Sequence, residues 1–223
     1  MQNLTLIIPA KNESKALPIF LNELKNYNYK KMVVLQKDDL ETIKSLSEFK
    51  EVEIYKQNKK GYGNALIEGI NNTNTEYFCI INADGSMDPK YLPKMLALCK
   101  DLDLVFASRY LKPEGGSDDD TFITLVGNKI FSFLGNFLFN LNISDILFTY
   151  VLGKTNSTKS LGIRSEDFRF CVELPIKAKK NNFKYKDLPS FERKRIGGFK
   201  KVNALKDGFL ILMGIISLYF QPK

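Results

Sequence analysis

Tyr77-Phe78-Cys79-Ile80-Ile81-Asn82-Ala83-Asp84-Gly85-Ser86 is an apolar run that passes directly into turn-forming residues. A continuous run of this kind predicts a strand buried on both faces, which is typical of parallel sheets covered by helices. Such sheets bind ligands outside the carboxyl ends of their strands, so Asp84 is expected where a ligand binds. A carboxylate there suits a hard divalent cation shared with substrate phosphates. The same residues are also typical of a simple Asx turn.

Similar apolar segments lie on both sides of this stretch and alternate with helical patterns. Strands are predicted over residues 4–8, 32–35, 52–55, 77–81 and 102–107, and helices over about 15–27, 39–49, 61–71 and 89–100. Residues 12–14 are expected to cap the first helix. Strands that alternate with helices indicate βαβ units, so we predict an α/β fold with a mostly parallel sheet flanked by helices. Its site-forming loops are expected at 9–13, after Leu35, and at 82–88.

The alternation ends near residue 112. An apolar region follows over 121–152, interrupted at 127–129 and 140–142, and a second apolar run covers 208–220. Each uninterrupted piece is shorter than the roughly 20 residues that span a bilayer. The 208–220 run can pack on the core, lie in a membrane interface or form an oligomer contact. A helix is also predicted over about 162–182, and a basic loop over 193–201.

The composition limits the catalytic groups, metal ligands and binding partners that the chain can have. The chain has 223 residues, which fits one domain with a short appendage. It contains no histidine, which excludes a Ser–His–Asp or Cys–His catalytic pair and an imidazole-ligated metal. Its 33 Lys and Arg exceed its 25 Asp and Glu, so an anionic partner is expected: nucleic acid, a phosphorylated small molecule or an acidic membrane surface. The three cysteines form no close pair, and no signal peptide is visible, which favours a reduced cytoplasmic setting.

Two further segments are candidates for anion binding. Lys59-Lys60-Gly61-Tyr62-Gly63 precedes a predicted helix, whose N-terminus favours anions, but a lone G-x-G is weak support. The basic loop from Arg193 to Lys201 suits phosphate, although most isolated basic stretches are simply solvated.

The order of these segments along the chain resembles that of family 2 glycosyltransferases, which have the GT-A fold. Within the family, the chain is most similar to the branch that loads a sugar onto polyprenyl phosphate, as dolichyl-phosphate mannosyltransferases do. The resemblance covers about residues 4–202. It rests on Ile7-Ile8-Pro9-Ala10-Lys11-Asn12-Glu13, similar to IIPAYNE; on Asn58–Ala65 with Gly69; on Asn82-Ala83-Asp84 at the D-x-D position; on Ser108-Arg109-Tyr110; on Ser144-Asp145 with Phe148; and on Pro189, Arg195, Gly198 and Lys201 at the spacing of P…R-x-x-G-x-S-K.

The resemblance implies site residues in three groups. Donor-binding residues would be Pro9, Ala10, Asn12, Glu13, Gly63, Asn82, Ala83 and Asp84. Asp84, with Ser86 two residues later, would hold Mg²⁺ or Mn²⁺. Arg109, Lys129, Arg195 and Lys201 would surround the donor and acceptor phosphates, and Asp84, Arg109 and Arg195 would be catalytic. Residues 1–202 would form the GT-A domain, with 121–152 as the membrane-interface and acceptor region, and 203–223 an apolar C-terminal helix.

The implied function is inverting transfer of a sugar from a UDP- or GDP-linked donor to a polyprenyl phosphate or related lipid-linked acceptor at the cytoplasmic membrane face, in cell-envelope glycan synthesis. An acceptor that is already an anion needs little general-base help, so the missing histidine is no obstacle. The protein is expected to bind the membrane peripherally. It can also form a homo-oligomer or bind a membrane protein, and it is not expected to bind nucleic acid. Glu166-Asp167 can supply a base, or can simply be charge partners of the helix that follows.

Some positions depart from the family pattern. The family usually has D-D-G-S after the second strand, whereas this chain has Leu35-Gln36-Lys37-Asp38-Asp39, and Asn82 replaces the first acid of D-x-D. An alternative is therefore a catalytically degenerate GT-A protein that binds a nucleotide sugar or acts as a scaffold. A nucleotidyltransferase is disfavoured, because residues 9–13 contain no glycine.

Overall fold

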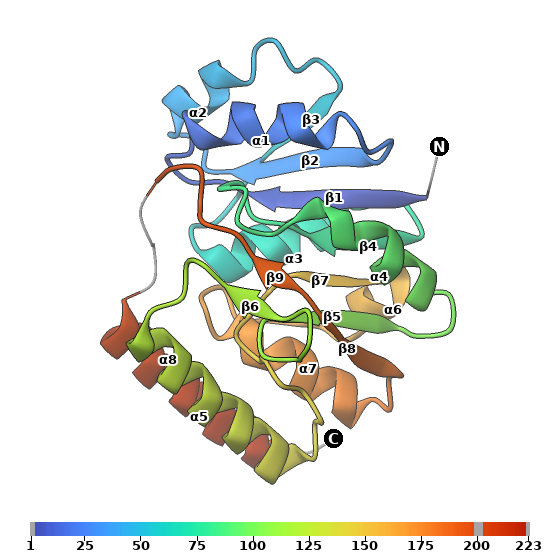
Figure 1. Ribbon diagram of the computed structural model, residues 1–223, viewed down its shortest axis with the longest axis vertical. Coiled ribbons are helices and arrows are strands. Elements are labelled where there is room, and N and C mark those ends of the chain that lie inside the picture. The colour runs from blue at the N-terminus through green and yellow to red at the C-terminus, as the bar shows by residue number, and fades with distance from the viewer. Residues whose placement is uncertain (1–2, 199–202, 222–223) are drawn as a thin grey trace.

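The computed structural model describes residues 3–198 and 203–221 and has a central seven-stranded sheet (Figure 1). Its strands, in the spatial order β3-β2-β1-β4-β7-β5-β8, are β3 (Val52–Lys56), β2 (Lys30–Leu35), β1 (Leu4–Pro9), β4 (Tyr77–Ile80), β7 (Val151–Lys154), β5 (Leu104–Ser108) and β8 (Tyr185–Pro189). Every neighbouring pair is parallel except those made by β7, which is antiparallel to β4 and β5. The predicted mostly parallel α/β sheet is confirmed.

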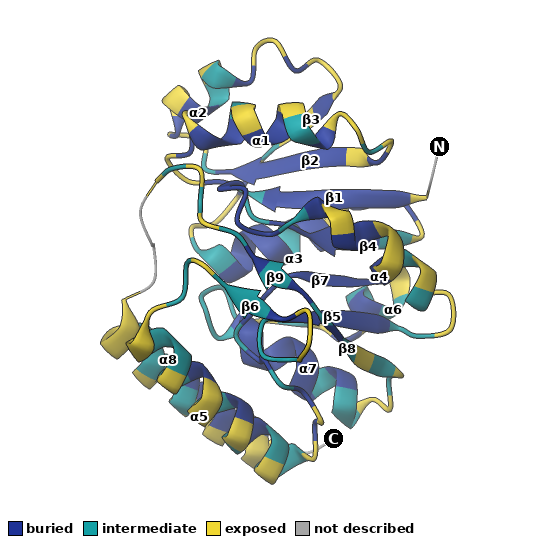
Figure 2. Cartoon of the chain, in the orientation of Figure 1, coloured by how far each residue is buried: buried dark blue, intermediate teal, exposed yellow. Residues whose placement is uncertain are grey.

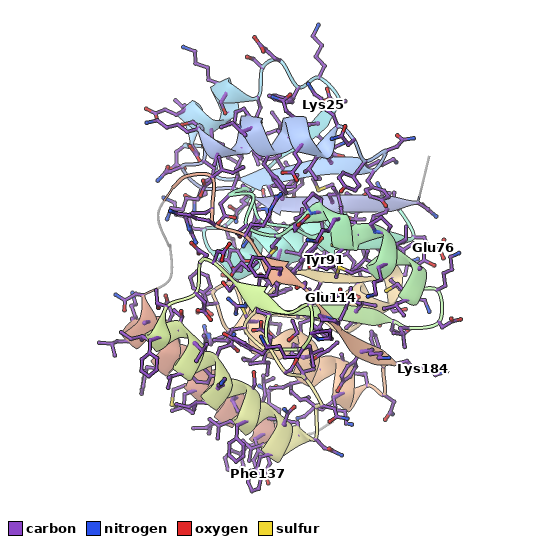
Figure 3. All side chains as sticks on the ribbon, viewed as in Figure 1. Lys25, Glu76, Tyr91, Glu114, Phe137 and Lys184 are labelled. Carbon is purple, nitrogen blue, oxygen red and sulfur yellow. The ribbon has the colours of Figure 1, made fainter. Side chains whose placement is uncertain are left out.

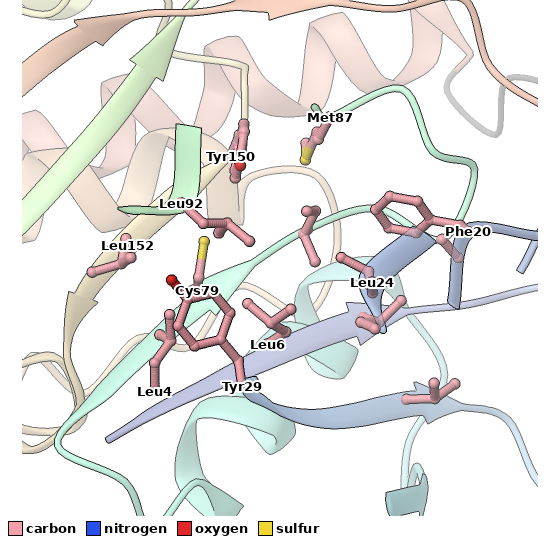
Figure 4. Close-up of a cluster of buried hydrophobic side chains, with 14 of the residues drawn as sticks. Leu4, Leu6, Phe20, Leu24, Tyr29, Cys79, Met87, Leu92, Tyr150 and Leu152 are labelled. Atoms are coloured by element: carbon pink, nitrogen blue, oxygen red, sulfur yellow. The ribbon is translucent and has the colours of Figure 1, made fainter. Parts of the chain in front are cut away.

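Helices cover both faces of this sheet. They are α1 (Ala16–Leu24), α2 (Leu40–Ser45), α3 (Tyr62–Asn72), the short 3₁₀ helix η1 (Pro89–Tyr91) with α4 (Leu92–Leu98), α5 (Phe122–Phe139), α6 (Thr155–Ser160), α7 (Phe170–Lys180) and α8 (Ala204–Phe220). Helices α1 and α4 pack on one face through residues such as Phe20, Leu24 and Leu92 (Figure 4). Helices α3, α7 and α8 pack on the other through residues such as Leu66 and Ile215. The sheet is therefore buried from both sides, as the continuous apolar runs predict.

Strand β7 is the main element that the local pattern missed. The expected membrane-interface region 121–152 ends in Val151 and Leu152, which lie in the middle of the sheet between β4 and β5. Ile146 and Tyr150, earlier in the same region, are also buried. Most side chains of residues 143–152 are buried in the core. Within 121–152, the exposed apolar side chains therefore belong to α5.

Helix α5 runs without a break through residues 127–129, where the apolar stretch of the sequence is interrupted. Asn128 is buried and its amide donates to the Asp145 carboxylate, so a polar residue anchors the helix to the core instead of ending it. The helix ends at Asn140, which adopts a left-handed conformation (φ 53°), as the expected break at 140–142 requires. Its 18 residues have a mean hydropathy of 1.4, so α5 is long and apolar enough to cross a membrane by length and composition, and 17% of it is buried.

Two other expected helix boundaries were wrong. The first helix starts at Ala16, with Lys15 at the N-cap and no side-chain cap. Asn12 does not cap it, since its backbone is left-handed (φ 55°) and its N–H donates to the carboxylate of Asp39. The predicted helix over 162–182 is α7 only from Phe170 onward. The residues before it form a loop whose backbone N–H groups at Arg164 and Ser165 are bound by the carboxylate of Glu173.

A small two-stranded sheet pairs β6 (Gly116–Ser117) with β9 (Phe191–Glu192). It crosses over the main sheet (Figure 1) and carries the segments that contain Asp119 and Arg195 toward the loop after β4. In particular, the backbone N–H of Ile196 donates to the carbonyl of Asp84 at 2.8 Å. The basic loop is thus fastened to the polar loop that follows β4.

Candidate active site

A cavity of about 710 Å³ opens at the carboxyl ends of the parallel strands, where the sheet type predicts a ligand. Its walls come from the ends of β1 to β4, from the 118–120 and 165–168 loops, and from the N-terminal halves of α5 and α8. The expected site residues that line it are Pro9, Ala10, Glu13, Asn82, Ala83, Asp84, Arg109 and Arg195. The loops after β1 and β4, far apart in the chain, therefore contribute to one site.

Asp84 is a nearly buried carboxylate, and its two oxygens have different partners. Oδ1 accepts hydrogen bonds from the backbone N–H of Ser86 at 3.1 Å and from its hydroxyl at 2.8 Å. Oδ2 lies 3.4 Å from Nη1 of Arg195, and both residues line the cavity. Ser86 is buried and does not line the cavity. The Ser86 hydroxyl thus orients Asp84, and its expected role as a metal ligand stays a prediction.

The donor set around Asp84 suits a cation that is held mainly by substrate. Among the described residues, no group of three Asp, Glu, Cys or His side chains could hold a metal. Mg²⁺ and similar ions are commonly bound by one or two carboxylates together with substrate phosphates, so Asp84 alone fits this mode. The described lining residues include seven carboxylates (Glu13, Asp84, Asp119, Asp120, Asp167, Glu192 and Asp207) and four cationic groups (Lys11, Lys60, Arg109 and Arg195). A diphosphate entering such a cavity requires added positive charge.

Arg109 does not have the free guanidinium that phosphate binding was expected to use. Its Nε and Nη2 donate to the two oxygens of Asp145 at 2.8 and 2.9 Å, and its Nη1 donates to Glu192 at 3.1 Å. Burial alone would lower the pKa of Arg109, but the carboxylate of Asp145, with that of Glu192, raises it well above its ordinary value. Arg109 therefore forms a buried ion-pair network that joins the end of β5 to β9 and to the loop before β7.

The remaining sequence predictions have mixed outcomes. Lys129 is exposed and does not line the cavity, because its neighbour Asn128 takes the inward position. Asn12 is also exposed and outside the lining. Gly63 lies against the backbone of residues 165–167, where an added Cβ would be 2.2 Å from the carbonyl oxygen of Ser165. Glycine at this position therefore lets α3 pack closely against that loop. Lys201 lies outside the described residues.

Arg195 is held in the cavity wall by a residue that sequence analysis did not select. Its Nε and Nη2 donate to the two carboxylate oxygens of Asp119 at 3.2 and 2.8 Å. Asp119 belongs to the polar 113–120 loop, which carries no motif. Only the tertiary contact marks it as part of the site.

Tyr62 is a second site residue that was missed, although it stands inside the G-x-G segment. Its hydroxyl lies 2.6 Å from Oγ1 of Thr149 and donates to Oδ1 of Asn82 at 3.3 Å. Its ring stacks on Phe168, with centroids 5.0 Å apart. Burial, the larger cause, raises the pKa of Tyr62 well above its ordinary value, so the hydroxyl stays protonated. Asn82 at the D-x-D position is thereby held by a neutral donor.

Comparisons with known proteins agree with this geometry. The sequence profile of Glycosyl transferase family 2 matches residues 5–162. Uncharacterized glycosyltransferases of Mycobacterium bovis and Mycobacterium tuberculosis are each 28% identical to the chain over 210 residues, which is 93% of this chain and 93% of each relative. Glucosyl-3-phosphoglycerate synthase from M. tuberculosis, crystallised with Mn²⁺, UDP and phosphoglyceric acid, has a TM-score of 0.72 at 12% identity and covers 100% of this chain and 80% of that one. At that identity the likeness shows a common fold.

The family profile identifies a glycosyltransferase that uses a nucleotide-sugar donor, and the sheet order and the cavity at the strand ends agree with it. The chain belongs to glycosyltransferase family 2, since the family profile covers more than half of its length. The resemblance is confirmed for the family. The relatives named above do not point to the dolichyl-phosphate branch.

Proposed function

We propose that the protein moves a sugar from a UDP- or GDP-linked donor to a polyprenyl phosphate, or a related lipid-linked acceptor, at the cytoplasmic surface of a membrane. The observation that carries this proposal is the course of the cavity, which continues from Asp84 to the N-terminal halves of α5 and α8. The donor would lie along the strand ends, and the acceptor would enter from the two helices.

The helix end of the cavity combines apolar side chains with Thr124, Asn128 and Asp207, and it has room for a chain. Ile123 and Phe131 of α5 and Leu205 and Ile211 of α8 line it. Two glycines also line this end. A Cβ added at Gly127 would meet nothing within 4 Å, and one added at Gly208 would meet only the Phe131 ring, at 3.9 Å. These glycines leave a gap between the helices that suits an unsaturated hydrocarbon chain whose phosphate reaches toward Asp84.

The outer faces of the same helices are apolar and exposed. Helices α5 and α8 lie side by side at one end of the molecule (Figure 1), and exposed residues follow their outer surface (Figure 2). The large exposed apolar residues are Phe122, Ile123, Val126, Ile130, Phe133 and Phe137 on α5, and Leu205, Phe209, Met213, Ile216, Tyr219 and Phe220 on α8. Ile123 and Leu205 also reach the cavity. Phe137, 74% exposed, projects away from the body (Figure 3). A paired apolar surface of this kind suits the interface of a bilayer better than water.

Basic residues flank this face. Lys129 projects from α5, and Lys179 and Lys180 lie at the end of α7, where the Lys180 ammonium donates to the carbonyl oxygens of Leu218 and Gln221 at the end of α8. Anionic headgroups attract lysines that lie beside an inserted apolar surface. These lysines can therefore meet anionic headgroups, whereas Arg109 inside the cavity is already paired with the carboxylates of Asp145 and Glu192.

The chemistry that we propose needs positioning and charge neutralisation. Asp84 would hold Mg²⁺ or Mn²⁺, which when bound neutralises the donor diphosphate as it leaves. Arg195 would donate to the same phosphates. An acceptor phosphate oxygen attacks the anomeric carbon from the face opposite the leaving diphosphate, which inverts the configuration. No proton has to be removed from that anion, so the absence of histidine is accommodated.

The test is transfer of labelled sugar from UDP- and GDP-sugars to polyprenyl phosphate in vesicles, by wild type and Asp84→Asn. We expect a lipid-linked product from wild type with one class of donor, and a loss of about 100-fold or more in Asp84→Asn. Sugar transfer to a soluble acceptor but not to the lipid would contradict the acceptor assignment. A folded wild type that binds the donor but transfers to nothing would favour a degenerate binding protein.

Membrane binding is tested separately with the double substitution Phe133→Ser and Phe137→Ser. Neither residue lines the cavity, so donor binding should be unchanged, while co-sedimentation with vesicles containing anionic lipid should fall several-fold. Ile19→Ser is a matched control, because Ile19 is 56% exposed on α1, away from α5 and α8. Equal vesicle binding by all three proteins would contradict the proposed membrane face.

A further inference from the structure

Three consecutive carbonyl oxygens of the loop that carries Asp84 are bound by one short segment from a much later part of the chain. The backbone N–H of Arg193 donates to the carbonyl of Ser86 at 2.8 Å, and that of Ile196 donates to the carbonyl of Asp84. The carbonyl between them, that of Gly85, accepts from the guanidinium of Arg193, from Nε at 3.1 Å and from Nη2 at 2.7 Å. A cationic side chain therefore takes the place that a backbone donor fills on either side.

The same guanidinium is also bound by Glu23 of α1. Nη1 and Nη2 of Arg193 donate to the two carboxylate oxygens of Glu23 at 2.8 and 3.0 Å. Glu23 lies in the last turn of α1, where a negative charge does not stabilise the helix itself. Helix α1 is fixed on the sheet by buried residues such as Phe20 and Leu24. Glu23 therefore holds the guanidinium in place from an element that belongs to the core.

One peptide bond connects this arginine to the carboxylate of Asp84. The Gly85 carbonyl that Arg193 binds and the N–H of Ser86 belong to the same peptide unit, which is planar, so fixing the carbonyl also fixes the N–H. That N–H donates to Oδ1 of Asp84 at 3.1 Å. A cationic donor on the carbonyl also polarises the unit, which strengthens its N–H as a donor. Arg193 therefore acts on Oδ1 of Asp84 from the other side of one peptide unit.

We propose that Arg193, supported by Glu23, is a positioning residue that orients the Asp84 carboxylate for its divalent cation. Arg193 does not line the cavity, so it acts through the peptide unit between Gly85 and Ser86 and not on the donor. Lysine cannot replace it in full, because an ammonium lacks the planar fork that binds the Glu23 carboxylate and the Gly85 carbonyl together. This inference rests on the proposed function, in which Asp84 holds Mg²⁺ or Mn²⁺.

Removal of the guanidinium should leave the backbone of this segment in place. The backbone N–H of Arg193 keeps its carbonyl partner, and the preceding residue, Glu192, pairs with Met87 through an antiparallel bridge. Arg195 should therefore stay beside Asp84. If the Arg193 side chain acted instead by placing Arg195, its loss would move a like charge away from Asp84 and raise the affinity for Mn²⁺. The two routes predict changes of opposite sign.

The experiment is titration of the whole protein with Mn²⁺, followed by electron paramagnetic resonance, both alone and with UDP or GDP present. Arg193→Met should lower the affinity for Mn²⁺ about three- to tenfold in both conditions, and Arg193→Lys should lower it less. Glu23→Gln should lower it about two- to threefold, and should add nothing when Arg193→Met is already present. Lys94→Met is the matched control, because it removes an exposed ion pair with Glu114 and should leave Mn²⁺ binding unchanged.

Turnover gives a second readout, which a loss of stability alone would not produce. Raising the Mn²⁺ concentration should restore most of the kcat of Arg193→Met, but not that of Asp84→Asn. Glu23→Gln keeps the inference testable if Arg193→Met fails to fold, because it retains the arginine. Wild-type or raised Mn²⁺ affinity in the folded variants of Arg193 and Glu23 would overturn the positioning role. Wild-type Mn²⁺ affinity in Asp84→Asn would overturn the metal assignment of the proposed function itself, so the two failures are distinguishable.

Discussion

Nη1 of Arg195 lies 3.4 Å from Oδ2 of Asp84, the carboxylate oxygen that does not accept from Ser86. A cation of the protein thus stands beside the carboxylate to which we assign Mg²⁺ or Mn²⁺. Asp119 shares this guanidinium through two further hydrogen bonds. The positive charge of Arg195 opposes a second cation at Asp84 until a diphosphate is present to separate them.

The first prediction concerns metal binding without nucleotide. Arg195→Gln should raise the affinity for Mn²⁺ alone several-fold, because it removes a like charge beside Asp84. The same change should lower turnover by 100-fold or more, since it removes a donor to the leaving diphosphate. Mn²⁺ titration followed by electron paramagnetic resonance measures the first effect. Unchanged Mn²⁺ affinity would show that Arg195 does not oppose the metal.

The second prediction separates Arg109 from phosphate binding. Arg109→Ala leaves Asp145 buried without its partner, and we expect a loss of about 3–5 kcal/mol in the free energy of unfolding. Lys129→Ala, at an exposed position, should change it by less than about 0.5 kcal/mol and leave donor binding intact. Urea unfolding measures both. A stable Arg109→Ala protein that has lost only donor affinity would restore the phosphate role.

The third prediction concerns Gly63. A methyl group there would meet the carbonyl oxygens of Ser165 at 2.2 Å and Asp167 at 2.5 Å, which belong to backbone that cannot easily move. We expect Gly63→Ala to destabilise the protein by about 1–3 kcal/mol and to displace the loop that carries Asp167. Gly127→Ala is the matched control in α5, where the added methyl has open space and should be neutral or stabilising by up to about 1 kcal/mol.

The fourth prediction is a dependence of stability on pH at Glu173. Burial raises the pKa of this carboxyl, but hydrogen bonds from Lys177 and from the backbone N–H groups of Ser165 and Arg164 outweigh burial and hold the pKa below its ordinary value of 4.5. A lowered folded-state pKa contributes stability above 4.5 that is lost as the pH falls through the folded value. Glu173→Gln should therefore be less stable than wild type at pH 7, and the difference should shrink as the pH falls below 4.5. A difference that stays constant down to pH 3 would argue against this carboxylate.

The strands and the ligand-binding edge could be predicted because their causes are local. The run that ends at Ile81 must be buried on both faces, and a carboxylate three residues later must lie at the end of a strand. Strand β7 could not be predicted in the same way. Val151 and Leu152 look like any apolar pair, and their place in the sheet comes from antiparallel pairing with β4 and β5, which lie far earlier in the chain.

The sequence by itself determined the fold class, the family and the loops after β1, β2 and β4 that line the cavity, because periodicity, turn residues and motif order are properties of neighbouring residues. Tertiary structure alone decided which charged groups are available. Arg109 meets Asp145 across 36 positions and is engaged in ion pairs, and Arg195 meets Asp119 across 76, which holds its guanidinium beside Asp84. Charge pairing depends on distance in space, and no local pattern encodes which carboxylate will come within 3 Å of a guanidinium.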